Sequence, residues 1–219
     1  MRKVPFVKGE LYHVYNRGVE KRNLFEDSLD FFRFLKSIIE FNKPSVVGGI
    51  YRAELPINQL RHEMSQLVDI IAFCILPNHY HFILRPRVDG GVEKFMQRFG
   101  NGYTKYFNAR HKRSGALFQG VFKSIHVDTN EYLLRLAVYV NQNYLVHKLR
   151  HEMSQFVYSS YNQYAGIKDM MVEKYKINID PEIILSQFRN TEDFIEFCDK
   201  TIPLIHESKK QQKIVEFGL

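Results

Sequence analysis

The sequence predicts an α+β fold in which helices pack on one antiparallel sheet, with a small helical tail at the C-terminus. Three observations support this fold class. Short runs rich in aromatic and β-branched residues alternate with longer runs whose apolar residues recur every three or four positions. Two of the short runs follow each other across a turn dipeptide, as in an antiparallel hairpin. The resulting order, strand, helix, strand, strand, helix, strand, helix, is typical of a ferredoxin-like core.

The first half of this core consists of a strand and a helix. Residues 10–17 (ELYHVYNR) have strand composition and end before a glycine. Residues 28–42 are predicted to be helical, because apolar residues recur at spacings of three and four after an Asp-Ser pair that can start a helix. We interpret residues 43–67, which lack a clear period, as an irregular insertion.

The second half begins with a hairpin. Residues 68–76 and 79–84 are predicted strands joined by a Pro-Asn turn dipeptide. A helix is expected over residues 92–109, with aromatic residues on one face and a basic polar face opposite. A short strand near residues 122–127 follows, and a capping-box-like start then predicts a helix over residues 130–149.

The tail after Tyr164 contains two predicted helices, around residues 181–188 and 191–200. The chain of 219 residues is long enough for one good core with a small appendage. Hydrophobic residues form 45% and charged residues 25% of the sequence, which excludes wholesale disorder.

Cellular location and redox state can also be inferred. No run of about 18 apolar residues could span a bilayer, and the N-terminus lacks the apolar core of a signal peptide, so we expect a cytoplasmic protein with no membrane partner. Cys74 and Cys198 are far apart and form no CxxC pair, which predicts two buried thiols rather than a disulfide or a zinc knuckle.

The net charge of +7 is concentrated in one segment. Residues 94–150 hold ten Lys and Arg residues against two acidic ones, whereas residues 165–219 hold eight against ten. Within residues 94–123 cations and aromatic residues interleave, a mixture that suits single-stranded and hairpin DNA. We assign the aromatic residues there to packing and the cations to DNA binding. These cations are Lys105, Arg110, Lys112, Arg113 and Lys123.

The heptapeptide LRHEMSQ occurs twice, at residues 60–66 and 149–155. A local duplication on solvated helix faces is the simpler interpretation, and a second metal or partner site is the alternative. Zincin chemistry is excluded, because Gln66 and Gln155 stand where an HExxH motif needs its second histidine.

The histidine pair at the start of the second hairpin strand is the clearest chemical feature. Alternate side chains of a strand share a face, so His79 and His81 project to one side and Tyr80 to the other. Two imidazoles at this spacing can hold a divalent metal, but two ligands alone are not sufficient.

Four motifs, the second of which contains this pair, follow one another along the chain: LYHVYNRGVEKRNLF, CILPNHYHFILRP, YTKYFNARHKRSGALFQGVFKS and YLLRLAVYVNQN. With them the sequence resembles the HUH single-tyrosine transposases of the insertion-sequence-200-like superfamily, especially those associated with repetitive extragenic palindromes. The resemblance covers residues 8–164, which we take as the transposase domain, and leaves residues 165–219 as the helical tail.

The resemblance implies a role for each site residue. The two histidines would bind Mg²⁺ or Mn²⁺, and Tyr139, on the helix after the last strand, would be the nucleophile. Asn143, four residues later and so on the same helical face, would be the third ligand, with Gln142 as the alternative. Tyr132 and Tyr144 compete with Tyr139 on the same helix, but neither has an amide four residues on.

The implied activity is cleavage and rejoining of single-stranded, hairpin-bearing DNA through a 5′-phosphotyrosine. Arg17, in an Asn-Arg-Gly turn after the first strand, would be a further DNA contact. Relatives work as monomers or as homodimers that share active sites, so both states are open. Two alternatives are a catalytically inactive or domesticated DNA-binding protein of the same fold and a relaxase-like nicking nuclease.

Overall fold

The computed structural model describes residues 5–44, 66–146, 156–168 and 171–212. Within these residues five strands form an antiparallel sheet in the order β4-β1-β3-β2-β5. The strands are β1 (Leu11–Arg17), β2 (Val68–Leu76), β3 (His79–Pro86), β4 (Lys123–Val127) and β5 (Tyr158–Ser159). The first four strands have the order expected of a ferredoxin-like core, and β5 is added at one edge. The predicted α+β fold class is confirmed.

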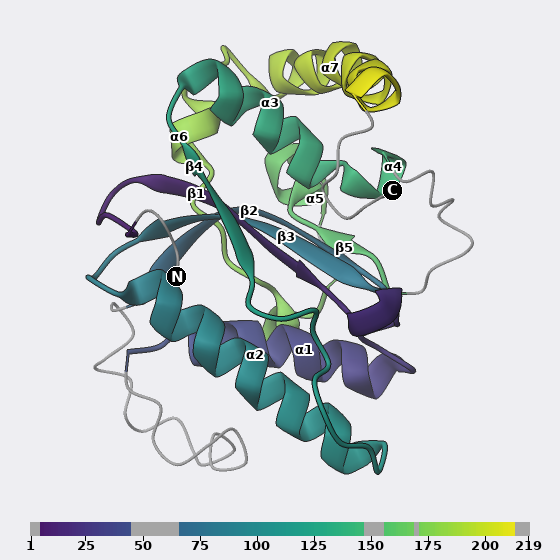
Figure 1. Cartoon of the computed structure of the whole chain (residues 1–219). Helices are drawn as coiled ribbons and strands as arrows, with labels where there is room; N and C mark the ends of the chain where they lie inside the picture. The colour runs from purple at the N-terminus through teal and green to yellow at the C-terminus, as the bar shows by residue number, and fades with distance from the viewer. Residues whose placement is uncertain (1–4, 45–65, 147–155, 169–170, 213–219) are drawn as a thin grey trace.

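Helices cover both faces of this sheet (Figure 1). One face, here called the helix-pair face, packs against α1 (Ser28–Phe41) and α2 (Gly91–Arg110). The opposite face, to which His81 and Ile83 of β3 point, is here called the histidine face. It is covered by α3 (Asn130–Asn141), α4 (Asn143–Val146), α5 (Tyr161–Tyr164), α6 (Glu182–Leu185) and α7 (Thr191–Gln212). Among the described residues, two 3₁₀ helices, η1 (Val19–Lys21) and η4 (Glu173–Tyr175), lie in connections.

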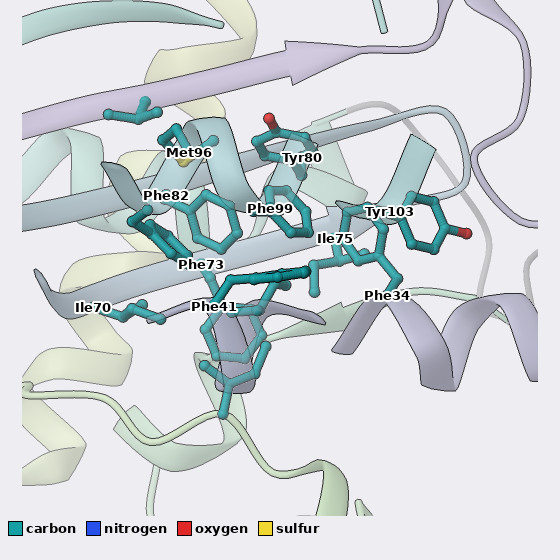
Figure 2. Packing of buried hydrophobic residues seen from close by; sticks show 14 of the residues in the cluster. Phe34, Phe41, Ile70, Phe73, Ile75, Tyr80, Phe82, Met96, Phe99 and Tyr103 are labelled. Atoms are coloured by element: carbon teal, nitrogen blue, oxygen red, sulfur yellow. The ribbon is translucent and has the colours of Figure 1, made fainter. Parts of the chain in front are cut away.

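The helix-pair face carries the larger aromatic cluster (Figure 2). Strand alternation directs Tyr80, Phe82 and Leu84 of β3 to this face. There the Tyr80 ring lies 5.5 Å from that of Phe99 in α2, which in turn lies 4.9 Å from Phe34 of α1. The aromatic residues of α2 therefore pack in the core, as the sequence analysis predicts.

The histidine face has a second apolar cluster in which the C-terminal segment takes part. Leu133 and Leu136 of α3 share this cluster with Phe194 and Cys198 of α7. The residues predicted as a tail therefore pack on the same sheet as α3, and the domain boundary at residue 165 stays a prediction. Cys74 and Cys198 are both buried free thiols, as expected.

The single helix predicted over residues 130–149 is wrong. α3 ends at Asn141, Gln142 has a φ of −115° and a ψ of 25°, and α4 then begins at Asn143. All three of these amide side chains are buried. Buried amides form hydrogen bonds that compete with those of the helix backbone, so the apolar period alone does not reveal the break. Residues 147–149 lie outside the described part of the chain.

The remaining expectations agree with the structure to different extents. The helix predicted at residues 181–188 is shorter, and the one predicted at residues 191–200 extends to Gln212. Both LRHEMSQ copies fall outside the described residues, apart from Gln66, as does most of the predicted insertion. In the ranges that the structure describes, no helix is both long and apolar enough to cross a membrane.

Candidate active site

β3 brings two histidines to the histidine face. His79 is the first residue of the strand, directly after the Pro-Asn turn, and pleating gives His81 the same orientation while Tyr80 enters the opposite core. His81 is fully buried and His79 is 8% exposed. Their ring centroids are 5.3 Å apart and the ring planes are nearly perpendicular, at 86°. The two imidazoles therefore lie side by side, each able to direct one nitrogen toward a common point.

Both histidine rings are held at their Nδ1 atoms. Nδ1 of His79 is 2.6 Å from Oδ1 of Asn78, and Nδ1 of His81 is 2.9 Å from Nε2 of His13. An amide oxygen can only accept, so Nδ1 of His79 donates this hydrogen bond, and in the neutral ring Nε2 then carries the lone pair. A partner on the second ring nitrogen is the usual way in which proteins orient metal-binding histidines.

Asn143 faces this lone pair with a second acceptor. Its side-chain Oδ1 lies 3.4 Å from Nε2 of His79, and the residue is fully buried. Two acceptors that face each other gain nothing as a hydrogen bond, but they suit a shared cation. Metal ions bind such donors at about 2.0–2.2 Å, which places adjacent ligands roughly 3 Å apart. The spacing of His79 and Asn143 therefore fits two ligands of one ion.

The chemistry of the donor set indicates which ion fits. Two imidazoles and an amide oxygen form a mixed nitrogen and oxygen set, which suits Mn²⁺ better than Mg²⁺, because Mg²⁺ prefers oxygen donors and waters. Among the described residues no group of three or more His, Cys, Asp or Glu side chains could hold a metal. The candidate set does not belong to that class, because its third member is an amide.

The break between α3 and α4 determines which amide faces His79. Backbone N–H groups at the start of α4, including that of Asn143, donate to the sulfur of Cys74 on β2. Burial raises the pKa of the Cys74 thiol to about 12, and these hydrogen bonds oppose the rise. The side chain of Gln142 instead forms a hydrogen bond with the Tyr161 hydroxyl. Of the two amides that the sequence analysis left open, Asn143 is the one beside His79.

Tyr139 of α3 lies over the same histidines. Its ring centroid is 5.4 Å from that of His81 and 6.2 Å from that of His13, with both pairs nearly perpendicular. The residue is 9% exposed. Of its two competitors, Tyr132 is half-buried against the apolar cluster of the histidine face. Burial raises the pKa of Tyr144, which lies near Cys198 of the C-terminal segment.

His13 of β1 is a site residue that the sequence analysis did not single out. Its ring centroid lies 5.1 Å from that of His81, and the residue is buried. Burial lowers the pKa of His13 to about 3, so the ring is neutral at physiological pH. The sequence shows a histidine in the first strand, but only the register between β1 and β3 reveals that it shares a face with His81.

Two of the predicted DNA-binding cations lie on the histidine face. Arg17 is opposite His79 in the register of β1 and β3, and Lys123 is opposite Tyr15, which is itself opposite His81. Residues directly opposite in an antiparallel pair share a face. Nε of Arg17 donates to Oε1 of Gln119 at 2.5 Å. The two cations therefore flank the histidines on one side, toward the β4 edge.

The other four predicted cations lie on α2 and the turn after it, in the layer on the opposite side of the sheet (Figure 1). Lys105 and Lys112 are exposed. Arg110 donates to the carboxylates of Asp27, at 2.6 Å, and Asp30, at 2.5 Å. Arg113 donates to the side chain of Asn108 and to a backbone carbonyl. The structure thus brings Arg17 and Lys123 to the candidate site. Arg110 and Arg113 instead form hydrogen bonds within the protein.

Comparisons with known proteins concern the same region. Residues 57–143 match the family model described as "Transposase IS200 like". The match covers less than half of the chain and shows a likeness to this family over these residues. The matched segment includes both β3 histidines, Tyr139 and Asn143, whereas β1 precedes it. No curated protein matches the chain in sequence.

A solved structure described as "Structure of the REP associates tyrosine transposase bound to a REP hairpin" is similar to the chain. The two are 12% identical, and the alignment covers 82% of this chain and 98% of that one, with a TM-score of 0.48.

Proposed function

We propose that this protein is a metal-dependent transposase that cleaves and rejoins single-stranded, hairpin-bearing DNA through a 5′-phosphotyrosine on Tyr139. One observation carries the proposal: the rings of Tyr139 and His81 meet on the face where the donor atoms of His79 and Asn143 lie 3.4 Å apart. A nucleophile next to converging metal ligands is the arrangement that phosphodiester transfer requires. The match of residues 57–143 to the family model of IS200-like transposases supports it.

The proposed reaction exchanges one phosphate ester for another. The Tyr139 oxygen forms a bond to phosphorus while the bond from phosphorus to the 3′ oxygen breaks. Tyr139 gives up its proton, and the departing 3′ oxygen gains one. Because the phosphodiester is conserved in the tyrosine ester, a 3′ hydroxyl can attack it and rejoin DNA without ATP.

The residues around the nucleophile make this exchange possible at neutral pH. A tyrosine hydroxyl has a pKa of about 10 in water, so it is a weak nucleophile unless the phosphate is activated. His79, His81 and Asn143 would hold Mn²⁺ or Mg²⁺, and the bound ion would supply Lewis-acid stabilisation of the charge that develops on the phosphate oxygens. Because both histidine rings are buried, their orientation is fixed before DNA binds.

We further propose that DNA reaches the site from the β4 edge. Arg17 and Lys123 both lie on the histidine face on that side, where cations would contact phosphates on either side of the scissile bond. The cations of α2 and of the turn after it lie in the other layer, so their predicted contacts would involve a more distant part of the hairpin, and we assign Lys105 and Lys112 to that role.

A covalent-adduct assay tests the proposal. The protein is incubated with Mn²⁺ and a pool of DNA hairpins whose single-stranded flanks are randomised, labelled at either the 3′ or the 5′ end. A denaturing gel should show the 3′ label attached to the protein and the 5′ label released on a free fragment, because the tyrosine is joined to the 5′ phosphate. Tyr139→Phe should form no adduct, and Tyr132→Phe, on the same helix, should form a normal one.

Other outcomes separate the alternatives. A wild-type protein that binds the hairpins tightly but forms no adduct would be a DNA-binding protein without the chemistry. An adduct that forms but never transfers its DNA to a second strand would indicate a nicking nuclease.

A further inference from the structure

His13 is a buried titratable group at the site for which the proposed reaction has no use. It lies on β1 opposite Ile83, diagonal to His81 on the same face. Its Nε2 is 2.9 Å from Nδ1 of His81, and the two rings are nearly parallel, at 21°. The ring of Tyr15 covers it at 4.8 Å and that of Tyr139 at 6.2 Å. A buried polar ring costs free energy unless it forms hydrogen bonds, and the partner of Nε2 of His13 is His81.

The geometry constrains where the proton between the two rings can be. A neutral imidazole has one N–H donor and one acceptor nitrogen. If His81 binds a metal through Nε2, its proton must be on Nδ1, and that N–H needs an acceptor. Nε2 of His13 is the atom 2.9 Å away. His13 must then carry its own proton on Nδ1 and accept at Nε2.

We propose that His13 is a positioning residue that fixes the tautomer and orientation of His81 so that Nε2 of His81 faces the metal. This inference rests on the metal site of the proposed function. The two histidines have hydrogen-bond partners in different places. The partner of His79 is Asn78, in the turn directly before β3, whereas the partner of His81 is His13, on the adjacent strand β1. The orientation of this proposed metal ligand therefore depends on the pairing of β1 with β3.

The tautomers can be measured without any substitution. Protein labelled with ¹⁵N-histidine and free of metal is examined by long-range ¹H–¹⁵N correlation, which distinguishes protonated from bare ring nitrogens. We expect a proton on Nδ1 of His81, a bare Nε2 on His81, and a proton on Nδ1 of His13. A proton on Nε2 of His81 would overturn the proposal, because His13 would then donate to His81 rather than accept.

Metal binding gives a second measurement. Free Mn²⁺ is titrated by electron paramagnetic resonance against wild type, His13→Phe, His13→Gln and His81→Ala, with DNA absent. Loss of a residue that hydrogen-bonds to a metal ligand typically weakens metal binding by about 10–100-fold. His13→Phe should therefore weaken Mn²⁺ binding by about 10–100-fold. His13→Gln should restore most of the affinity, because its amide oxygen can accept from Nδ1 of His81. His81→Ala should lose the site.

The outcomes are distinguishable. Unchanged Mn²⁺ binding in His13→Phe would mean that His13 only fills space. A loss equal to that of His81→Ala would mean that His13 is itself a ligand, and either result overturns the proposal. If His13→Phe fails to fold, the tautomers of the wild type still decide. If wild type binds no Mn²⁺, the metal site of the proposed function fails, while the tautomer measurement still judges the pairing of His13 with His81.

Discussion

The two faces of β3 are built on opposite principles. On the helix-pair face, Tyr80, Phe82 and Leu84 enter a cluster of aromatic rings from α1 and α2 (Figure 2). On the histidine face, the same strand presents His79 and His81 to a region where the backbone of α3 breaks and buried side chains are amides and imidazoles. Successive residues of one strand thus serve a core and a candidate reaction centre.

This difference separates the residues that stabilise the fold from those that would carry the chemistry. Burial of apolar rings contributes free energy of unfolding directly. A buried polar group costs free energy unless it is hydrogen-bonded, as the Nδ1 atoms of both histidines are. In the described part of the structure, Nδ2 of Asn143 is buried and has no hydrogen-bond partner. We therefore expect substitutions on the two faces to change different measurements.

The largest expected effect is on stability, at the helix-pair face. Phe99 is fully buried and its ring contacts those of Tyr80 and Phe34. Phe99→Ala should lower the free energy of unfolding by about 3–5 kcal/mol, through lost transfer energy and a cavity. Urea unfolding measures this change, while the Mn²⁺ affinity of the remaining folded protein should stay within about twofold of wild type. A large loss of Mn²⁺ affinity would show that the two faces are not separable.

The next effect is on metal binding, at the histidine face. Asn143→Ala should weaken Mn²⁺ binding by roughly 100-fold or more, because loss of a metal ligand should cost at least as much affinity as loss of a residue that hydrogen-bonds to a ligand. Gln142→Ala is the matched control, since Gln142 is also buried but bonds Tyr161. Isothermal titration of both variants with Mn²⁺ makes the comparison. Equal losses in the two variants would contradict the assignment of Asn143.

A smaller effect concerns the junction of α1 and α2. Arg110 donates to Asp27 and to the fully buried Asp30, so Arg110→Gln should lower the free energy of unfolding by about 1–2 kcal/mol. The hydrogen bond from Arg110 is the main reason that the pKa of Asp27 falls to about 2.

The lowered pKa of Asp27 predicts how this effect depends on pH. A carboxyl with a depressed pKa in the folded state stabilises the protein above its ordinary pKa of 3.8, and that stability is lost as the pH falls toward 2. Unfolding measured across this window should therefore show a flatter curve for Arg110→Gln than for wild type. Two parallel curves would indicate that Arg110 does not set the pKa of Asp27.

The smallest effect is on DNA affinity. Lys123→Ala should weaken hairpin binding a few-fold and reduce the slope of log affinity against log salt by about 1, because one phosphate contact is lost. Arg135→Ala is a suitable comparison, since Arg135 is an exposed cation on α3 beside α7. Fluorescence anisotropy at several salt concentrations measures both slopes. Equal slopes for the two variants would remove Lys123 from the proposed DNA path.

The elements of the fold were largely predictable because their periods are strong. The β2–β3 hairpin, α1 and α2 all agree with the predicted spans to within two residues. The end of α3 was not predictable, because it depends on contacts remote in sequence. Ser160 donates to Asn141, and Cys74 accepts from the start of α4. No local pattern in residues 130–149 encodes those partners.

The candidate site was likewise only partly predictable from the sequence. The geometry of His79 and His81 follows from strand alternation, which a sequence reveals. The role proposed for His13 depends on the register of β1 with β3, which the sequence does not give. The choice of Asn143 over Gln142 follows from the helix break. The predicted reason, that Asn143 and Tyr139 share a face of one continuous helix, is wrong, although Asn143 does lie at the site.

The most direct test of the central claim is to locate the covalent DNA attachment. After reaction with Mn²⁺ and hairpin DNA, nuclease trimming leaves a short nucleotide on the protein, and tryptic peptides are sequenced by mass spectrometry. The peptide between Arg135 and Lys148 contains both Tyr139 and Tyr144. We expect the nucleotide on Tyr139, joined through its 5′ phosphate, and only when Mn²⁺ is present. A nucleotide on Tyr144, or on Tyr139 in the absence of any divalent metal, would contradict the proposed site.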